Sequence, residues 1–154
     1  PLLTVNEHLE FIARAYRLTD WRERAEILIK RFELDDKRKM LTQALSKGMQ
    51  QKVSVCCALL HQPRAMILDE PLVGLDPHGI RELKEIMVSL RDEGCALLVS
   101  THMIESVEES WDQTYIMMRG RVARALRRAD MRAGESLEQE FFVVTEGPAR
   151  GEEI

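Results

Sequence analysis

The stretch that decides the fold is AMILDEPLVGLDP, residues 65–77, in which four apolar residues run directly into two adjacent acids. An apolar run of this length, followed by a loop rich in turn-forming residues, predicts a strand that is buried on both faces. Asp69 and Glu70 would lie at the end of this strand, with Asp76 on the loop beyond it. Because carboxylates are almost never buried without a partner, the adjacent acids predict a cation or a proton-transfer role beside them.

Helix and strand patterns alternate around this stretch. A helical pattern covers residues 47–62, and another covers residues 77–93 with Asp76 as its N-cap. A second short apolar strand is expected at residues 95–100. The order of strand, helix and strand predicts an α/β fold, a parallel sheet with helical cover. The later elements expected are a short helix at 103–110, a hairpin of strands over 114–118 and 121–125, a helix at 136–144 and a frayed end at 147–154.

Two amphipathic helices are expected before this alternating part. Thr4 followed by Glu7 is a capping-box pair, and Asp20 followed by Glu23 is an acidic version of the same signal. Each pair precedes apolar residues at helical spacing, so the two helices predict a helical hairpin. The charged residues 33–40 are expected to form a connection.

Composition excludes several classes of function. A net charge of −4 gives no overall basic field for nucleic acid, and no apolar run approaches the length of a membrane-spanning helix. No charged-then-apolar secretion signal is recognisable at the N-terminus. The three cysteines lack metal-binding spacing, which predicts reduced, mostly buried thiols in a cytosolic protein. The six arginines of residues 119–132 predict a solvated outer face rather than a nucleic-acid or acidic-lipid patch, because no aromatic residue interleaves them.

Candidate site residues follow both predicted core strands. Asp69 and Glu70 end the first strand, and Thr101 and His102 follow the second. Ligands of open parallel sheets bind beyond the carboxyl ends of the strands, so these residues are expected to face one crevice. One carboxylate can hold Mg²⁺ and the other can orient or deprotonate a water, while the histidine can contact a terminal phosphate.

The stretch LSKGMQ, residues 45–50, supplies a possible anion site. Ser46 is placed to cap a helix, and Gly48 allows the backbone to approach a ligand closely. Exposed N–H groups and a hydroxyl at a helix N-terminus attract anions. An ordinary helix start remains the alternative interpretation of this stretch taken alone.

Four motifs in order, LSKGMQ, MILDEP, GLDP and STH, resemble those of the ATP-binding-cassette (ABC) ATPases, over residues 3–125. The stretches TVNEHLEFIARAY and SKGMQQKV are most similar to the ATPase subunits of multidrug, antibiotic or sodium exporters. The resemblance implies a partial P-loop NTPase (RecA-like) core with an α-helical ABC subdomain. It divides the chain into a helical subdomain at 1–45, the second half of the ATPase core at 46–125, and a C-terminal helix and tail at 126–154.

The resemblance also implies roles for single residues. Asp69 would be the Walker B magnesium residue, Glu70 the catalytic base and His102 the switch histidine at the γ-phosphate. Asp76 would cross the interface of a dimer. Ser46, Lys47 and Gly48 would belong to the signature loop that grips a phosphate held by the opposing subunit. Lys47 and Met49 depart from the usual LSGGQ, which puts the contacts of the fifth side chain in doubt.

No GxxxxGK[ST] motif occurs in the sequence, so the P-loop that cradles the β- and γ-phosphates is missing. In the family this loop lies upstream, and a Gln-bearing loop then ends just before a stretch like PLLTV. The resemblance therefore implies that the chain corresponds to the C-terminal portion of a subunit. By itself this portion is expected to bind ATP weakly or not at all and to hydrolyse none. Sheet edges and apolar faces normally covered by the missing half are expected to be exposed and to favour self-association.

The implied function is coupling of ATP hydrolysis to transmembrane export, with ATP and Mg²⁺ as cofactors. The implied partners are a transmembrane permease and a second nucleotide-binding subunit, with no nucleic acid. The helical hairpin at residues 4–33 would either receive a cytoplasmic helix of the permease or simply cover the core. The expected location is cytoplasmic, peripheral on the inner face of the cell membrane. Two alternatives stay open: a non-transport ABC ATPase acting on nucleic acid or ribosomes, and a truncated, non-catalytic interaction module.

Overall fold

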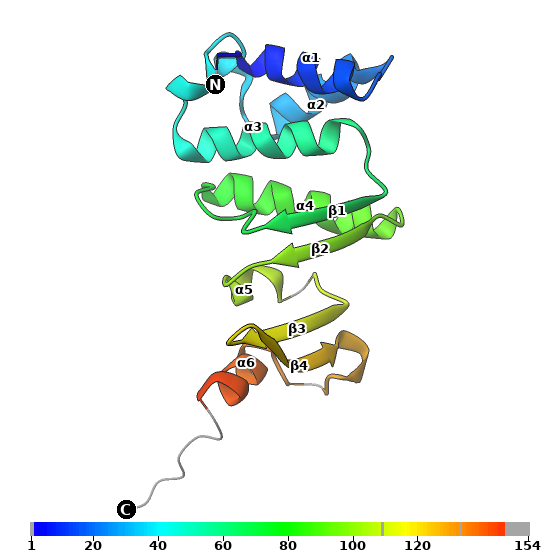
Figure 1. The fold of residues 1–154 in the computed structure, drawn as a ribbon, viewed down its shortest axis with the longest axis vertical. Coiled ribbons are helices and arrows are strands. Elements are labelled where there is room, and N and C mark those ends of the chain that lie inside the picture. The colour runs from blue at the N-terminus through cyan, green and yellow to red at the C-terminus, as the bar shows by residue number, and fades with distance from the viewer. Residues whose placement is uncertain (1, 109, 133, 147–154) are drawn as a thin grey trace, which may run out of the picture. The chain divides into compact units, whose positions relative to one another are not determined.

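The computed structural model describes residues 2–108, 110–132 and 134–146. The chain forms two compact units, residues 1–101 and residues 102–154. Figure 1 shows helices α1 to α4 and strands β1 and β2 in the first unit. The second unit contains α5, α6 and the hairpin of β3 and β4.

The first unit begins with α1 (Val5–Ala15) and α2 (Trp21–Arg31). The predicted capping box of α1 is confirmed: the Glu7 amide donates to Thr4 Oγ1 at 3.3 Å, and the Thr4 amide donates to Glu7 Oε2 at 2.7 Å. The acidic cap of α2 was predicted wrongly, because the Asp20 side chain makes no capping hydrogen bond. Its carboxylate accepts instead from the Thr19 hydroxyl at 3.0 Å, a local bond that competes with capping.

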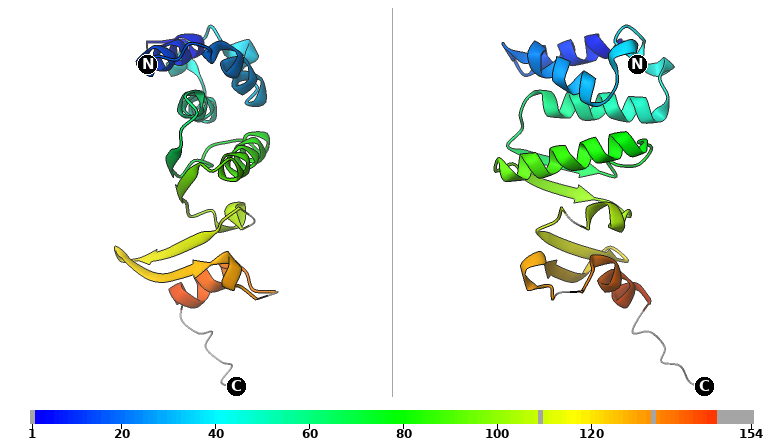
Figure 2. Two further views of the ribbon diagram at one scale, coloured as in Figure 1. Left: turned by 90° about the vertical axis from the view of Figure 1, so that its right-hand side faces the viewer. Right: turned by 180° about the vertical axis from the view of Figure 1, so that it is seen from behind.

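Both helices pack against α3 (Lys47–Leu60), as the views in Figures 1 and 2 show. Two short 3₁₀ turns, Asp35–Lys37 and Thr42–Ala44, lie in the connection between α2 and α3. The connection is tied to the start of α1 because the Val5 amide donates to the Met40 carbonyl at 3.2 Å. The core of this helical part consists of large apolar side chains that are almost fully buried, among them Val5, Leu9, Ile29, Phe32, Leu34 and Leu60.

The predicted parallel pairing is confirmed in the rest of the first unit. Strands β1 (Ala65–Asp69) and β2 (Ala96–Ser100) pair in parallel, with Asp69 opposite Ser100. Helix α4 (Pro77–Asp92) connects them and lies along one side of the pair (Figure 2). The α/β class expected from the sequence is therefore correct.

The two faces of this strand pair differ in burial. Met66 of β1 is 9% exposed, but the next residue, Ile67, is 82% exposed, and Leu98 of β2 is 59% exposed. The prediction of a strand buried on both faces is wrong, since α4 packs on one face and Ile67 and Leu98 point away from the core. The expected exposure of apolar side chains on one face of the sheet is observed at Ile67 and Leu98.

The second unit contains the predicted hairpin, formed by β3 (Gln113–Met118) and antiparallel β4 (Arg121–Arg127). It also contains α5 (Ile104–Val107), the 3₁₀ turn Arg128–Asp130 and α6 (Leu137–Glu146). The helix expected at 103–110 is thus only one turn long, and the frayed end expected at 147–154 lies outside the described residues. Trp111, Ile116 and Leu137 form the buried centre of this unit.

The arginines of residues 119–132 are exposed in the second unit, as a solvated face requires. Arg124 forms an ion pair with Glu140 at 2.9 Å, and Arg128 lies 3.6 Å from a Glu108 oxygen. Acidic side chains of the same unit therefore partly offset this basic stretch. Across the described part of the chain, no helix is both long and apolar enough to cross a membrane.

Candidate functional site

The acids and hydroxyls predicted at the strand ends lie at one edge of the β1–β2 pair. The parallel register places Asp69 opposite Ser100. One residue further, the Glu70 amide donates to the Ser100 carbonyl at 2.8 Å, which extends the pairing past the end of β1. Because both strands run in the same direction, both end at the same edge, and Thr101 is brought beside the carboxylates.

Each of the two acids accepts a hydrogen bond from a hydroxyl at the end of the neighbouring strand or directly after it. The Ser100 hydroxyl donates to Asp69 Oδ1, and the Thr101 hydroxyl donates to Glu70 Oε2 at 3.1 Å. Hydrogen bonds of this kind fix the orientation of a carboxylate before any ligand arrives. The sequence argument did not single out Ser100. Its position as the last residue of the second apolar strand could have identified it as a neighbour of Asp69.

Glu70 has an unusual backbone conformation, with φ at +45°. A non-glycine residue in this left-handed region typically carries about 1–2 kcal/mol of steric strain. Among the described residues, four other non-glycine residues have positive φ: Arg17, Glu33 and Gln62 just after helix ends, and Arg119 in the hairpin turn. Glu70 differs from the first three because it directly follows a strand, and it differs from Arg119 because it does not lie in a tight hairpin turn. The left-handed backbone therefore lies at the end of β1, at the residue whose carboxylate accepts from the Thr101 hydroxyl.

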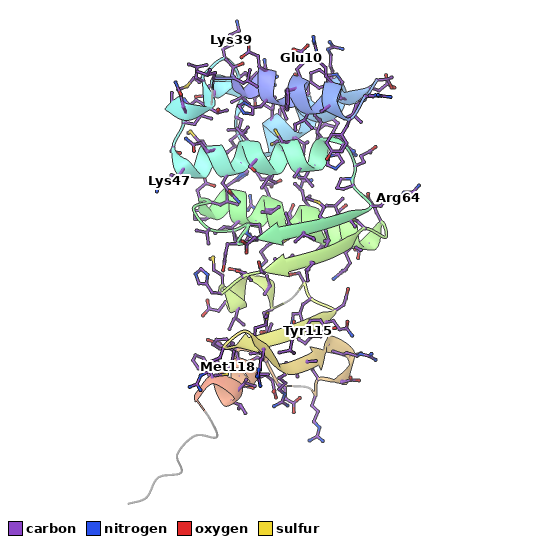
Figure 3. All side chains as sticks on the ribbon, in the orientation of Figure 1. Glu10, Lys39, Lys47, Arg64, Tyr115 and Met118 are labelled. Atoms are coloured by element: carbon purple, nitrogen blue, oxygen red, sulfur yellow. The ribbon has the colours of Figure 1, made fainter. Side chains whose placement is uncertain are left out.

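The predicted anion-binding helix start lies against the loop that follows Glu70. Ser46 is the N-cap of α3, and its Oγ accepts from the Met49 amide at 3.3 Å. A Cβ built on Gly48 would stand 2.3 Å from the Gly74 carbonyl oxygen, so the two backbones are in direct contact. Lys47 is exposed at this end of α3 (Figure 3). The structure therefore brings residues 46–48 and the loop 70–76 together.

Asp76 makes two bonds within its own chain. As predicted, it caps α4: its Oδ1 accepts from the Gly79 amide at 2.7 Å. Its Oδ2 accepts from Lys52 Nζ at 2.9 Å. The Lys52 ammonium, followed by the Gly79 amide, holds the pKa of the Asp76 carboxyl below its usual value. Lys52 was missed from the sequence because a lysine on a helix normally indicates a solvent-exposed position.

His102 follows Thr101 directly in the chain, but it belongs to the second unit. It is exposed there. The structure consequently does not place this histidine relative to Glu70, and its role stays a prediction.

The side chains at the strand ends provide only some of the oxygen ligands that a magnesium ion requires. Within the residues that the structure describes, no group of three or more His, Cys, Asp or Glu side chains could hold a metal ion. Asp69 supplies one exposed carboxylate. Mg²⁺ commonly binds one or two carboxylates and takes its other oxygen ligands from water and substrate phosphates, so Asp69 fits a site completed by a nucleotide.

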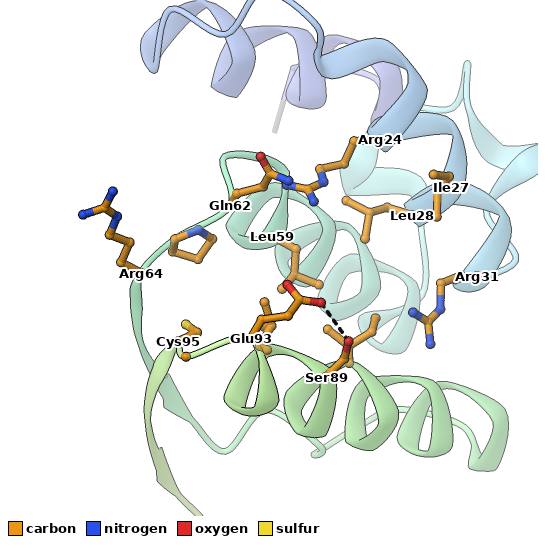
Figure 4. A pocket seen from close by; sticks show the side chains of 14 residues that line it. Arg24, Ile27, Leu28, Arg31, Leu59, Gln62, Arg64, Ser89, Glu93 and Cys95 are labelled. Atoms are coloured by element: carbon orange, nitrogen blue, oxygen red, sulfur yellow. Dashed lines mark hydrogen bonds between the residues drawn. The ribbon is translucent and has the colours of Figure 1, made fainter.

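A cavity of about 350 Å³ lies at the opposite ends of the strands, among α2, α3 and α4 (Figure 4). Its lining combines arginines such as Arg24 and Arg64 with apolar side chains. Ser89 donates to Glu93 across its floor at 3.1 Å. The cavity contains none of the predicted site residues, because Arg64 and Cys95 precede the strands whereas the acids follow them.

The cysteines have the properties of structural thiols. All three are free, as predicted, but only Cys56 is buried; Cys57 and Cys95 are half-buried, so the prediction of mostly buried thiols is correct for Cys56 alone. Burial raises the pKa of Cys57 to about 11, so its thiolate form is scarce at neutral pH. None of the three cysteines takes part in the hydrogen bonds described at the strand ends.

Comparison with protein families gives a match to the ABC transporter family over residues 1–73. This range includes the LSKGMQ stretch, Asp69 and Glu70. Among curated proteins, the chain is 39% identical over 122 residues to the ABC-type transporter ATP-binding protein EcsA of Bacillus subtilis strain 168, covering 78% of this chain and 49% of that protein. It is 35% identical over 128 residues to the SkfA peptide export ATP-binding protein SkfE of the same organism, covering 82% and 54%.

Solved structures give the same result. An ATP-binding subunit of an ABC transporter is 35% identical and superposes with a TM-score of 0.85, covering 93% of this chain and 62% of that one. The cbiO1 protein of Clostridium perfringens, part of the ABC transporter complex cbiONQ, is 30% identical with a TM-score of 0.62, covering 82% and 52%. The chain spans about half the length of the curated relatives named here.

Proposed function

Because the chain belongs to the ABC transporter family, we propose that it forms part of an ATP-binding subunit that couples ATP hydrolysis to transmembrane export. The export direction is supported by the similarity to a peptide export ATP-binding protein. The observation that carries the proposal is the pair of oriented carboxylates, Asp69 and Glu70, at the carboxyl ends of a parallel strand pair. This edge is where open α/β sheets bind their ligands.

In this proposal the two acids have different roles. Asp69 holds Mg²⁺, which supplies charge neutralisation at the phosphates when it is bound. Glu70 orients the attacking water and accepts its proton. The Thr101 hydroxyl, 3.1 Å from Glu70 Oε2, keeps the carboxylate aligned. The strained backbone of Glu70 supports the assignment, since strain of this kind concentrates at functional sites.

The remaining predicted residues act on the phosphates of ATP. His102 contacts the γ-phosphate. Ser46, Lys47 and Gly48 contact the nucleotide held by a second subunit, and Asp76 reaches across the same dimer interface. The exposed positions of Ser46, Lys47 and Asp76 support these roles, because each is accessible to a partner.

The partners that follow from this function are a transmembrane permease and a second nucleotide-binding subunit. The subunit would then be cytoplasmic and held at the inner face of the cell membrane by the permease. The helical hairpin at residues 4–33 presents exposed apolar side chains, Phe11 at 60% and Ile27 at 52%, that support docking of a permease helix.

The test is Glu70→Gln in the whole protein. Removal of a general base typically costs about 10²–10⁴-fold in rate, so ATP hydrolysis should fall by at least this much while ATP binding persists and the closed dimer accumulates. Glu105→Gln, at an exposed position on α5, is the matched control. Hydrolysis that continues unchanged in Glu70→Gln would exclude Glu70 as the base.

A second test concerns the 154-residue chain alone. Without a GxxxxGK[ST] loop it should bind Mg-ATP only weakly and hydrolyse none, because the main phosphate contacts are absent. Isothermal titration calorimetry measures this directly. Affinity in the micromolar range would show that the residues present suffice for binding and would overturn this expectation.

A further inference from the structure

One face of α3 lies along the loop that joins Glu70 to Asp76. Gly48, Gln51 and Lys52 share this face, because residues three and four positions apart lie together on a helix. At Gly48 the two backbones touch: an added Cβ would be 2.3 Å from the Gly74 carbonyl oxygen. No side chain separates the helix from the loop at this point.

The same face also binds both ends of the loop. Gln51 Nε2 donates to the carbonyl of Pro71, the residue after Glu70, at 3.3 Å. Lys52 Nζ donates to Asp76 Oδ2 at 2.9 Å. Pro71 itself is fully buried, and Leu72 is 1% exposed. The loop is therefore fixed to α3 at its start, its middle and its end.

Lys52 places a charged group at a buried position, where an apolar side chain would avoid the cost of desolvation. Lys52 is 5% exposed, and removing an ammonium group from water has a desolvation cost that its ion pair with Asp76 must offset. A methionine of similar length would fill the space without that desolvation cost, but it would leave the half-exposed Asp76 carboxylate without its bond to Lys52. The Asp76 carboxylate already caps α4 through Oδ1, and Lys52 adds the second bond that fixes the plane of the carboxylate.

We infer that Lys52 is a positioning residue that clamps the loop 70–76 onto α3, so that the helix start at residues 46–48 moves together with Glu70 and Asp76. Coupling between sites requires a continuous set of contacts of this kind. A ligand that displaces the start of α3 then displaces the catalytic carboxylate as well. The catalytic part of this inference rests on the proposed function; the clamp itself does not.

The clamp is tested first in the 154-residue chain by amide hydrogen exchange. In Lys52→Met, exchange of residues 71–79 should rise at least tenfold, while exchange in α1 and α2 stays unchanged. Lys39→Met is the control, because Lys39 is an exposed lysine outside the clamp (Figure 3). Asp76→Asn breaks the same ion pair from its exposed side while keeping an oxygen that can cap α4.

A double-mutant cycle separates the clamp from general loosening. If Lys52 acts through Asp76, the Lys52→Met/Asp76→Asn double variant should exchange no faster than Lys52→Met alone. Additive effects would overturn the inference. So would wild-type exchange of residues 71–79 in Lys52→Met.

The catalytic consequence is measured in the whole protein. Misplacing a catalytic group by 1 Å can cost about 100-fold in rate, so kcat for ATP hydrolysis should fall at least tenfold in Lys52→Met with KM for ATP unchanged within twofold. Lys52→Arg, which keeps the charge, should recover most of the rate. An unchanged kcat beside faster exchange would show a merely structural lysine and overturn the positioning role. A wild-type protein that hydrolyses no ATP would refute the proposed function, while the exchange cycle would still decide the clamp.

Discussion

The two faces of the β1–β2 strand pair have the same apolar character in sequence but opposite environments in the structure. On one face Met66 is 9% exposed, and α4, whose Leu83, Ile86 and Met87 are buried, lies along this side of the pair (Figure 2). On the other, Ile67 is 82% exposed and Leu98 59% exposed. The comparison shows that apolar residues in a strand indicate which surfaces need to be covered. They do not identify the element that covers them. A chain can therefore have the apolar pattern of a buried strand and still leave one face of that strand exposed.

The largest difference between the faces should appear in stability. Leu83→Ala removes a side chain that is 1% exposed, and truncation of a buried leucine typically costs about 2–5 kcal/mol of unfolding free energy. Ile67→Ala is the matched change on the open face, and it should cost less than about 0.5 kcal/mol. Urea unfolding of the two variants measures both values. Equal costs would mean that the open face is covered in solution.

The open face should also control self-association. Burying an isoleucine side chain stabilises a contact by about 1.5–3 kcal/mol, and each 1.4 kcal/mol changes a dissociation constant about tenfold. Ile67→Asp should therefore weaken association of the chain by at least about tenfold. Light scattering over a concentration series measures this. Phe11→Asp, which changes a 60% exposed residue on α1, should have no such effect; a wild-type chain that stays monomeric at high concentration would contradict the prediction.

Loss of a helix cap should have a smaller effect on the free energy of unfolding, and it involves neither face of the strand pair. Thr4→Ala breaks a complete capping box and should cost about 1 kcal/mol of unfolding free energy. Asp20→Ala removes an N-cap side chain without a capping bond, so its cost should lie within about 0.5 kcal/mol of zero. Thermal or urea unfolding distinguishes the two. A larger cost for Asp20→Ala would show that its carboxylate caps α2 in solution.

The smallest effect concerns pH and the start of α4, the helix that covers the buried face. Because the folded state lowers the pKa of Asp76, its contribution to stability is present above the unfolded pKa of about 4 and is lost as the pH falls through the folded value. The wild-type chain should lose slightly more stability than Asp76→Asn between pH 5 and strongly acidic conditions, by less than about 1 kcal/mol since the carboxylate is half exposed. Urea midpoints at several pH values measure this. Parallel pH profiles for the two proteins would assign the acid sensitivity to other groups.

Local signals in the sequence predicted most of the elements. The capping box at Thr4, the Asp76–Pro77 start of α4 and the hairpin around Arg119–Gly120 were predicted correctly, because each depends on residues within a few positions of one another. The predicted strand pairing also held, since parallel strands joined by a helix leave little choice of topology.

Features that depend on residues far apart in the sequence could not be predicted from local patterns. The open face at Ile67 depends on what packs on the sheet, which local periodicity does not contain. The hydroxyl of Ser100 and the ammonium of Lys52 became part of the site only through contacts across 31 and 24 positions of the chain. The relation of His102 to the carboxylates depends on how the two units are arranged and stays a prediction.

At position 70 the left-handed backbone favours glycine for stability, whereas the proposed chemistry requires a carboxylate. Glycine adopts this conformation without steric cost, so Glu70→Gly would relieve the strain and remove the carboxylate in the same step. Selection or engineering for thermal stability alone would favour that change. Libraries screened for stable variants of this chain should accumulate glycine at position 70, and they will need a separate screen for the acid if the site is to survive.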